Sequence, residues 1–280
     1  MKELDDLLIV GVRASLAAGE AILGVYESDF QVDIKEDGSP LTLADQRAHA
    51  IIDSALEPTG LPILSEEGKD VPYEQRKAWE VFWLVDPLDG TKEFIHRRGE
   101  FTVNIALIEN GRPTLGVIYV PTGNRLYFGH IESGAYRTRG NSAALAIASA
   151  ESSEKSMSAL LKNSERLPIA TTDSPVLHII GSRSHATEHM ERFLEEKRRK
   201  GRAVQFVSAG SSLKFCRVAE GTADVYPRFG PTMEWDTAAG QAVAECAGAD
   251  VIEHPAGTPL SYNKPDLHNP WFMVRRKTRQ

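Results

Sequence analysis

The sequence predicts a layered α/β protein, and two patterns in the chain support this prediction. In the second half, short apolar runs alternate with amphipathic segments, as strands alternate with helices in layered folds. In the first half, Asn110-Gly111 separates two apolar runs, which is a strong signal for a β-hairpin. The length of 280 residues suits one large domain or two small ones that share a core.

The first half is expected to start with two helices and to continue as an antiparallel meander. Apolar residues recur at helical spacing over residues 3–26. A second helix is expected to begin at Thr42 and to end near Leu56, before the breaker Pro58-Thr59-Gly60. Strands are expected at residues 61–64, 81–85, 101–108, 114–120 and 125–128.

Residues 139–175 are rich in Ala, Ser and Thr and have little periodicity, so we expect the domain boundary there. The predicted division is an N-terminal subdomain of residues 1–140 with the metal-binding loops and a C-terminal subdomain of residues 141–280 with substrate-binding residues, together one catalytic unit. In the second half, strands are expected at residues 177–180, 203–207, 223–226 and 250–252, and helices at residues 187–200, 211–220 and 235–247.

Charge and cysteine content narrow the class of protein. The formal net charge is −7, so no overall basic field would attract nucleic acid. The basic runs at residues 197–200 and 275–277 are interpreted as a solvated helix end and a loose tail. Cys216 and Cys246 lie in apolar-periodic segments without metal-binding spacing, which predicts buried, unreactive thiols.

Targeting signals are not expected in this chain. Its first residues do not have the pattern of a signal peptide, and no run is expected to approach the ~20 apolar residues of a membrane span. We therefore expect a cytoplasmic enzyme, with peripheral association at the inner membrane as an open alternative.

The most informative stretch is residues 83–91, where an apolar run ends in Asp86 and Asp89. Two close carboxylates repel each other and need a cation or a shared proton. Carboxylate oxygens suit a hard cation such as Mg²⁺, and Gly90 and Thr91 add an N–H group and a hydroxyl for an anionic substrate or an attacking water. The alternative is that Asp86 and Asp89 are simply turn residues, but the stretch favours metal-assisted phosphate chemistry.

Three further acidic segments are candidate partners of this stretch. Glu66 follows a short strand, where it would lie in an exposed acidic loop or at the same strand-end edge. Asp236 is either the N-cap of a helix or part of an anion-binding helix start. Thr42 and Asp45 fit a capping box, but Asp45 could also polarise a water near a metal.

Basic and polar residues in the second half are candidate phosphate ligands. Ser211 and Lys214 open a predicted helix, where capping explains the serine but does not require the lysine. Arg228 follows an apolar strand and would form an ion pair or a bidentate phosphate contact. His185 and His189 match the H-x-x-E-H pattern of zinc peptidases; contact of His185 with a substrate phosphate, or plain surface exposure, is the favoured interpretation.

Taken together, Asp86-Pro87-Leu88-Asp89-Gly90-Thr91, Trp235-Asp236-Thr237-Ala238-Ala239-Gly240 and the acidic pair Glu66-Glu67 resemble the signatures of the inositol monophosphatase superfamily of Mg²⁺-dependent, Li⁺-sensitive phosphatases. The chain is most similar to its CysQ-type 3′(2′),5′-bisphosphate nucleotidase branch. This resemblance covers nearly the whole chain, apart from an apparent insertion near residues 141–175 and the basic tail.

The resemblance implies an αβαβα sandwich and a role for each matching residue. Metal ligands would be Glu66, Asp86, Asp89, Asp236 and the backbone carbonyl of Leu88. Asp45 with Thr91 would activate the attacking water. The substrate would be bound by Gly90, Thr91, His185, Ser211, Lys214, Arg228 and Asp236, of which His185, Ser211, Lys214 and Arg228 would hold the phosphate that is not cleaved.

The expected activity is Mg²⁺-dependent hydrolysis of the 3′-phosphate of adenosine 3′,5′-bisphosphate to AMP and phosphate, which would recycle a by-product of sulfur assimilation. The substrate name follows from the resemblance. The expected partner is therefore this small bisphosphate nucleotide and not a nucleic acid, and the protein would be a monomer or a homodimer. The alternatives are an inositol or sugar phosphatase of the same fold, a non-catalytic sensor of the nucleotide, and a zinc peptidase.

Overall fold

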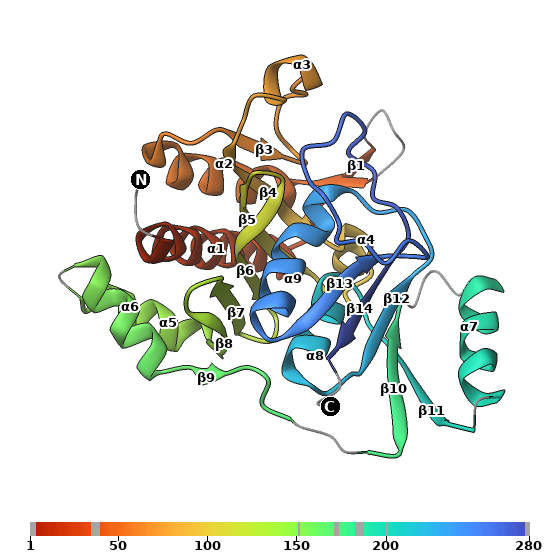
Figure 1. Ribbon diagram of the computed structural model, residues 1–280. Helices are drawn as coiled ribbons and strands as arrows, with labels where there is room; N and C mark the ends of the chain where they lie inside the picture. The colour runs from red at the N-terminus through yellow and green to blue at the C-terminus, as the bar shows by residue number, and fades with distance from the viewer. Residues whose placement is uncertain are drawn as a thin grey trace.

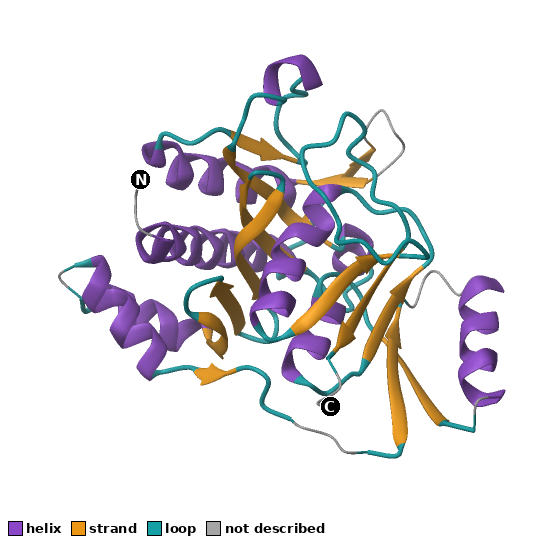
Figure 2. Ribbon diagram, in the orientation of Figure 1, coloured by secondary structure: helices purple, strands orange, loops and turns teal. Residues whose placement is uncertain are grey.

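The computed structural model describes residues 4–34, 40–150, 152–170, 174–182, 188–199 and 201–277. In this part of the chain a seven-stranded and a five-stranded sheet alternate with layers of helices (Figure 1). The layer order is helices, large sheet, helices, small sheet and one outer helix, which confirms the predicted αβαβα sandwich. Figure 2 shows the helices on both sides of each sheet.

The first helical layer contains α1 (Leu4–Tyr26) and α2 (Leu43–Leu56), close to the predicted bounds. Both helices bury apolar residues against one face of the large sheet, in a core that also contains Trp83 and Ile105. This burial is the main stabilising contribution of the layer, because apolar area removed from water is worth roughly 25 cal/mol per Å².

The composition of α1 corrects one expectation. This helix is long and apolar enough, by these criteria alone, to cross a membrane, although no such run was expected. In the structure, 56% of its apolar window is buried inside the protein. The apolar composition is therefore explained by packing against α2 and the sheet, since a core helix meets the same criteria.

The large sheet has the order β3-β4-β5-β6-β7-β8-β9. β3 and β4 are parallel and the remaining neighbours are antiparallel. Asn110 and Gly111 take positive φ angles of 51° and 74° between β5 and β6, which confirms the predicted hairpin. The strand bounds are β3 (Ile63–Ser65), β4 (Val81–Asp89), β5 (Thr102–Glu109), β6 (Arg112–Val120), β7 (Arg125–His130), β8 (Gly134–Arg139) and β9 (Glu165–Arg166).

The middle layer contains α8 (Leu213–Glu220) and α9 (Glu234–Cys246), which are packed between the two sheets. The small residues at the start of α9 allow this close approach. A Cβ atom on Gly240 would lie 2.4 Å from the ring of Phe215 on α8. A side chain at this position would therefore push the two helices apart.

The small sheet has the order β11-β10-β12-β14-β13, with α7 (Glu188–Arg199) on its outer face. Its strands are β10 (Val176–Gly181), β11 (Ala203–Ser208), β12 (Val225–Arg228), β13 (Ala249–Glu253) and β14 (Phe272–Arg276).

The interpretation of residues 275–277 as a loose tail is wrong. Arg275 and Arg276 belong to β14, which pairs with β12 on one side and β13 on the other. Arg276 also donates to the backbone carbonyl of Gly221 at 3.2 Å, and Lys277 lies 3.3 Å from Asp250. The other basic run does form the end of a helix, α7, with Lys200 outside the described residues.

Two helices that the sequence did not predict occupy the segment that was interpreted as a boundary. α5 (Gly140–Ala148) and α6 (Ser153–Lys162) pack on each other and on α1, and they contribute Ala143 and Leu160 to its core. The division into subdomains stays a prediction. The remaining short elements are β1 (Val32–Ile34), β2 (Pro40–Thr42), η1 (Glu57–Thr59), α3 (Tyr73–Arg76) and α4 (Thr91–Ile95).

Cys216 is buried, as predicted, whereas Cys246 is half-buried. Burial raises the pKa of Cys216, and it raises the pKa of Cys246 to about 12. Both thiols therefore remain protonated at neutral pH, and the reactive form of a cysteine is the thiolate.

Candidate active site

Three carboxylates meet where β3, β4 and α9 converge. One oxygen from each of Glu66, Asp86 and Asp236 lies within 4.8 Å of the others. The parallel pairing of β3 and β4 produces half of this arrangement, because the Glu66 backbone N–H donates to the Val85 carbonyl at 3.1 Å. The third carboxylate comes from the first turn of α9, more than 140 residues further along the chain.

Asp89 lies beside this group but has other contacts in the structure. Its Oδ2 accepts hydrogen bonds from Ser211 Oγ at 2.7 Å and from Asn104 Nδ2 at 3.2 Å. The strand register shifts between Asp86 and Asp89, and Leu88 between them donates its N–H to Asp86 Oδ1 at 3.1 Å. The Leu88 carbonyl lies 3.3 Å from Thr91 Oγ1, as a second acceptor within reach of its one hydrogen.

The electrostatics of the cluster favour a bound cation. Burial, followed by the charges of Glu66 and three Asp carboxylates, raises the pKa of Asp86 well above its ordinary value. Burial and the charge of Asp89 raise the pKa of Asp236 to about 8. Buried, converging oxygen ligands that repel each other fit a hard divalent cation, which would remove the repulsion.

Asp45 makes both of the contacts that the sequence presented as alternatives. Its Oδ2 accepts from the Thr42 backbone N–H at 2.7 Å and from Thr42 Oγ1 at 2.5 Å, which caps α2. Its Oδ1 accepts from Thr91 Oγ1 at 3.2 Å. One carboxylate therefore both terminates a helix and orients the hydroxyl that follows the Asp86–Gly90 turn.

Gly90 makes this turn possible. Its φ angle is +96°, in a region that residues with a side chain seldom adopt. A Cβ atom here would also lie 3.1 Å from the Glu100 carbonyl oxygen. The turn directs Thr91 back toward Asp45 and starts α4.

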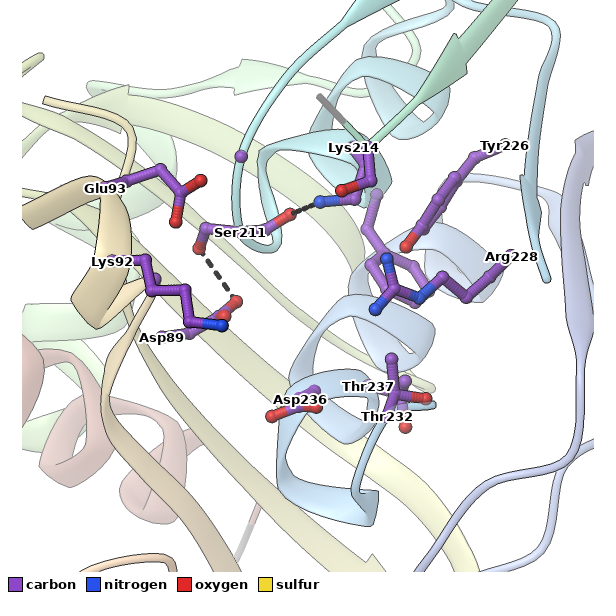
Figure 3. Close-up of a pocket in the computed structure, with 14 residues that line it drawn as sticks. Asp89, Lys92, Glu93, Ser211, Lys214, Tyr226, Arg228, Thr232, Asp236 and Thr237 are labelled. Carbon is purple, nitrogen blue, oxygen red and sulfur yellow. Dashed lines mark hydrogen bonds between the residues drawn. The ribbon is translucent and has the colours of Figure 1, made fainter. Parts of the chain in front are cut away.

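A cleft with about 620 Å³ of free space, counted to its open mouth, lies between these carboxylates and the start of α8. Figure 3 shows Lys214, Tyr226 and Arg228 on one side of this cleft and Asp89, Lys92 and Glu93 on the other. Its lining residues are Asp89, Gly90, Lys92, Glu93, Ser182, Gly210, Ser211, Lys214, Phe215, Tyr226, Arg228, Thr232, Asp236 and Thr237.

Lys214 is a buried cation in this cleft. Its Nζ donates to the Ser211 carbonyl at 2.5 Å and lies 5.4 Å from the centre of the Tyr226 ring. Burial lowers its pKa to about 8, against an opposing effect of Asp89. The lysine is therefore mostly charged at neutral pH and close to its titration point.

Arg228 has a buried donor that the structure leaves unpaired. One terminal nitrogen donates to the Pro231 carbonyl at 2.8 Å, but Nε has no hydrogen-bond partner among the described residues. Buried polar groups without a partner are rare, so this donor at the cleft is available to a ligand.

The serines before α8 do not cap it, contrary to one sequence interpretation. Ser212 is the residue at the cap position, but its side chain makes no capping bond; its Oγ donates to the Asp236 carbonyl at 3.1 Å. Ser211 binds Asp89 and has a φ angle of +53°. Asp236 is likewise not an N-cap: it lies three residues inside the helix and accepts from the Met233 N–H at 2.8 Å.

Of the two histidines in the zinc-peptidase pattern, His185 lies outside the described residues and His189 does not line the cleft. His189 is on α7, where its ring centre lies 4.5 Å from that of Trp271. Among the described residues, the group that could hold a metal ion is the acidic cluster.

Sequence reasoning missed several residues that shape the site. Asn104 donates to Asp89 and, at 3.0 Å, to Ser212 Oγ. Glu100 accepts from the Gly210 N–H at 2.9 Å and so anchors the loop before α8. A signal for Asn104 was present, because a buried polar side chain among the apolar residues of a strand has to be satisfied by a nearby partner.

The fold and the clustered carboxylates define a metal-dependent phosphatase of the αβαβα type. A sequence profile of the inositol monophosphatase family matches residues 3–272, and the chain belongs to this family. It is similar to the 3′(2′),5′-bisphosphate nucleotidase CysQ of Escherichia coli strain K12, at 44% identity over 92% of this chain and 94% of that protein. The protein of the same name from Salmonella typhimurium strain LT2 is 42% identical over the same shares.

Solved structures agree with this assignment. CysQ from Bacteroides thetaiotaomicron, described as a bacterial member of the inositol monophosphatase family, has a TM-score of 0.86 at 47% identity, with 97% of each chain covered. The extragenic suppressor protein suhB from Bartonella henselae has a TM-score of 0.72 at 23% identity, covering 96% of this chain and 92% of that one. The second likeness supports the fold alone.

Proposed function

We propose that this protein is a Mg²⁺-dependent 3′(2′),5′-bisphosphate nucleotidase that releases the 3′-phosphate of adenosine 3′,5′-bisphosphate. The decisive observation is that one cleft is lined by Asp89 and Asp236, next to the acidic cluster, and by the cations Lys214 and Arg228, with a third cation, Lys92, beside Asp89. Such a cleft suits a substrate with two phosphates: one is cleaved at the acidic end and the other is held at the basic end. The CysQ relatives carry this activity in their names.

The acidic end would hold the metal. Glu66, Asp86 and Asp236 already converge, and Asp89 and the Leu88 carbonyl would complete the set. A divalent cation in this position supplies a Lewis acid that lowers the pKa of a bound water and stabilises the leaving oxygen. The oxygen-only donors support the choice of Mg²⁺.

Asp45 and Thr91 would orient the attacking water and take up its proton. Thr91 Oγ1 donates its hydrogen to Asp45, so the lone pairs of the hydroxyl can accept a hydrogen from water. Asp45 is 1% exposed, and Thr42 holds its other oxygen. The pair is therefore prearranged for general-base work.

Lys214, Arg228 and Ser211 would bind the phosphate that is not cleaved. The unpaired Nε of Arg228 and the charged ammonium of Lys214 are donors for a dianion. Gly90 lines the same cleft and offers a backbone N–H group toward the reacting phosphate. His185 keeps its proposed role as a further phosphate ligand. We place the enzyme in the cytoplasm, because α1, the helix apolar enough to cross a membrane, is packed against α2 and the large sheet.

The test compares two substrates. We expect Arg228→Ala and Lys214→Ala each to lower kcat/KM for adenosine 3′,5′-bisphosphate by roughly 10- to 100-fold, because a charge-assisted hydrogen bond is worth ~1.5–3 kcal/mol. Hydrolysis of adenosine 3′-monophosphate, which lacks the second phosphate, should change little. Phosphate release with Mg²⁺ is the measurement.

Arg192→Ala is the matched control, since Arg192 is an exposed arginine whose partner is Glu188 on the same helix. It should leave both activities unchanged. Equal losses on the two substrates would show that Lys214 and Arg228 support the fold and not the bisphosphate specificity. Absence of phosphate release from the bisphosphate would overturn the proposed activity itself.

A further inference from the structure

A second cavity, with about 930 Å³ of free space to its open mouth, lies on the large sheet away from the catalytic cleft. It opens where β7 begins and β8 ends. Three arginines line it, together with one carboxylate and small polar residues. The lining residues are Gly123, Arg125, Arg137, Thr138, Arg139, Ser142, Asn163 and Glu165.

The strand register concentrates positive charge on one face of this hairpin. Arg125 and Arg139 are direct cross-strand partners, and Arg137 pairs with Tyr127 two residues further along. Residues two apart in a strand point to the same face, so the three guanidinium groups share it. Like charges directly opposite each other destabilise a sheet, unless something between them compensates.

Carboxylates neutralise only part of this charge. Arg137 is paired with Glu165 and with the fully buried Glu220, each at 2.6 Å. Glu220 is also shared with Arg217 at 3.2 Å. In the described part of the chain no carboxylate forms an ion pair with Arg125 or Arg139, which leaves two cations facing the cavity.

We propose that the cavity bounded by Arg125, Arg137 and Arg139 is a second anion site, which binds a tetrahedral oxyanion of the phosphate or sulfate class. Guanidinium groups match two oxygens of such an anion at once. The hydroxyl of Ser142, at the start of α5, offers a further neutral donor. The anion would supply the compensation that the opposed arginines lack.

This site is separate from the catalytic one. Asp89 at the end of β4 and Arg139 at the end of β8 are four strands apart in the sheet order. With neighbouring strands about 4.8 Å apart, this is a separation of ~19 Å along the sheet. The two sites share one helix, because α8 carries Lys214 in its first turn and ends at Glu220, the partner of Arg137.

The experiment is a calorimetric titration of the chelator-treated protein with sulfate at low ionic strength. We expect Arg125→Gln/Arg139→Gln to weaken sulfate binding tenfold or more, since two charge-assisted contacts are lost. The matched control is Arg192→Gln/Arg199→Gln, which removes two exposed α7 arginines with partners on their own helix and should change binding less than twofold. Lys214→Ala/Arg228→Ala should retain the site.

The proposal is overturned if the Arg125→Gln/Arg139→Gln variant binds sulfate as the wild type does. It is also overturned if the α7 control loses binding equally, or if the active-site variant abolishes it. A second measurement guards against misfolding: in chloride buffer the Arg125→Gln/Arg139→Gln variant should melt at or above the wild-type temperature, because the opposed charges are gone, and sulfate should no longer raise that temperature.

Two further ligands distinguish the sources of the anion. Inorganic phosphate and AMP are titrated separately into the Lys214→Ala/Arg228→Ala variant. Equal affinity indicates a site for free phosphate, and tighter AMP binding indicates a site for a nucleotide phosphate. Failure of both to bind would contradict the assignment.

Discussion

At the scale of single residues, Asp45 caps α2 and contacts Thr91, so its capping role and its proposed catalytic role can be tested separately. We expect Asp45→Asn to lower kcat by ~10²–10⁴-fold with little change in KM, because the amide is no base for the water near Thr91. It should also lower the free energy of unfolding by about 1 kcal/mol, because an amide caps α2 less well. Steady-state kinetics and urea unfolding measure the two effects.

Thr42→Ala is the control for the capping role. It removes one of the two cap contacts on Asp45 and leaves the contact with Thr91. We expect the free energy of unfolding to fall by a similar amount and most of the activity to remain. If Asp45→Asn were to lose stability and keep normal specific activity, the carboxylate would be a helix cap and nothing more.

The buried cation Lys214 predicts a pH dependence. Burial lowers its pKa to about 8, so the ammonium loses its proton as the pH rises through that value. We expect kcat/KM for the bisphosphate nucleotide to fall above pH 8, and the fall to move to higher pH in Lys214→Arg, which stays charged. A monophosphate without the second group should show no such fall; a parallel fall would assign the titration to another residue.

At the scale of elements, Glu234 connects the start of α9 to the loop before β14 by hydrogen bonds. This buried carboxylate accepts from the Asn263 N–H at 2.7 Å, the Lys264 N–H at 3.0 Å and Lys264 Nζ at 2.6 Å. The backbone N–H of Glu234 donates to the Leu267 carbonyl at 3.0 Å. The loop before β14 thus holds the helix turn that carries Asp236.

Glu234→Gln should destabilise the protein by about 2–3 kcal/mol, because Lys264 loses its buried partner while keeping some contact with water. Adding Lys264→Met should recover part of this loss, since no unpaired charge then remains. Urea unfolding of the three variants measures the effect. If the double variant were no more stable than Glu234→Gln, the ion pair would not be the cause.

Most elements could be predicted from the sequence because their apolar spacing is regular. α5 and α6 were missed because their apolar faces are short and rich in small residues, and they become helices against α1. β14 was missed because its last residues are basic; pairing with two neighbouring strands outweighs that local signal.

At the scale of the whole molecule, the acidic cluster links stability to pH and metal. The folded-state pKa of Asp236 is about 8 against 3.8 unfolded, and that of Asp86 is also raised. Between pH 3.8 and about pH 8 the folded protein therefore binds more protons than the unfolded chain. The metal-free protein loses stability as the pH rises through this range. We expect its Tm to fall from pH 6 to pH 9.

Mg²⁺ should reverse this loss, most strongly at the higher pH, because the ligands must be deprotonated to bind it. Asp86→Asn should raise the Tm of the metal-free protein at pH 9, weaken the effect of Mg²⁺, and lower activity by orders of magnitude. Differential scanning calorimetry with and without chelator tests this. A variant with near-normal turnover in Mg²⁺ would show that Asp86 is no ligand.

The sequence by itself determined the family, the layered class and the local chemistry of residues 83–91. These are properties of adjacent residues: an apolar strand, two carboxylates, a glycine turn and a hydroxyl. Local sequence patterns also predicted the capping box of α2 and the hairpin at Asn110, because caps and turns depend on a few neighbouring dihedral angles and hydrogen bonds.

Only the tertiary structure decided which distant groups meet. Strand pairing brings Glu66 to Asp86, and the packing of α9 on the sheet brings Asp236 to both. The same folding leaves Arg228 Nε unpaired at the cleft and sets Arg125 opposite Arg139. Burial and long-range contact then set the charge of each group, and neither is a property of neighbouring residues in the chain.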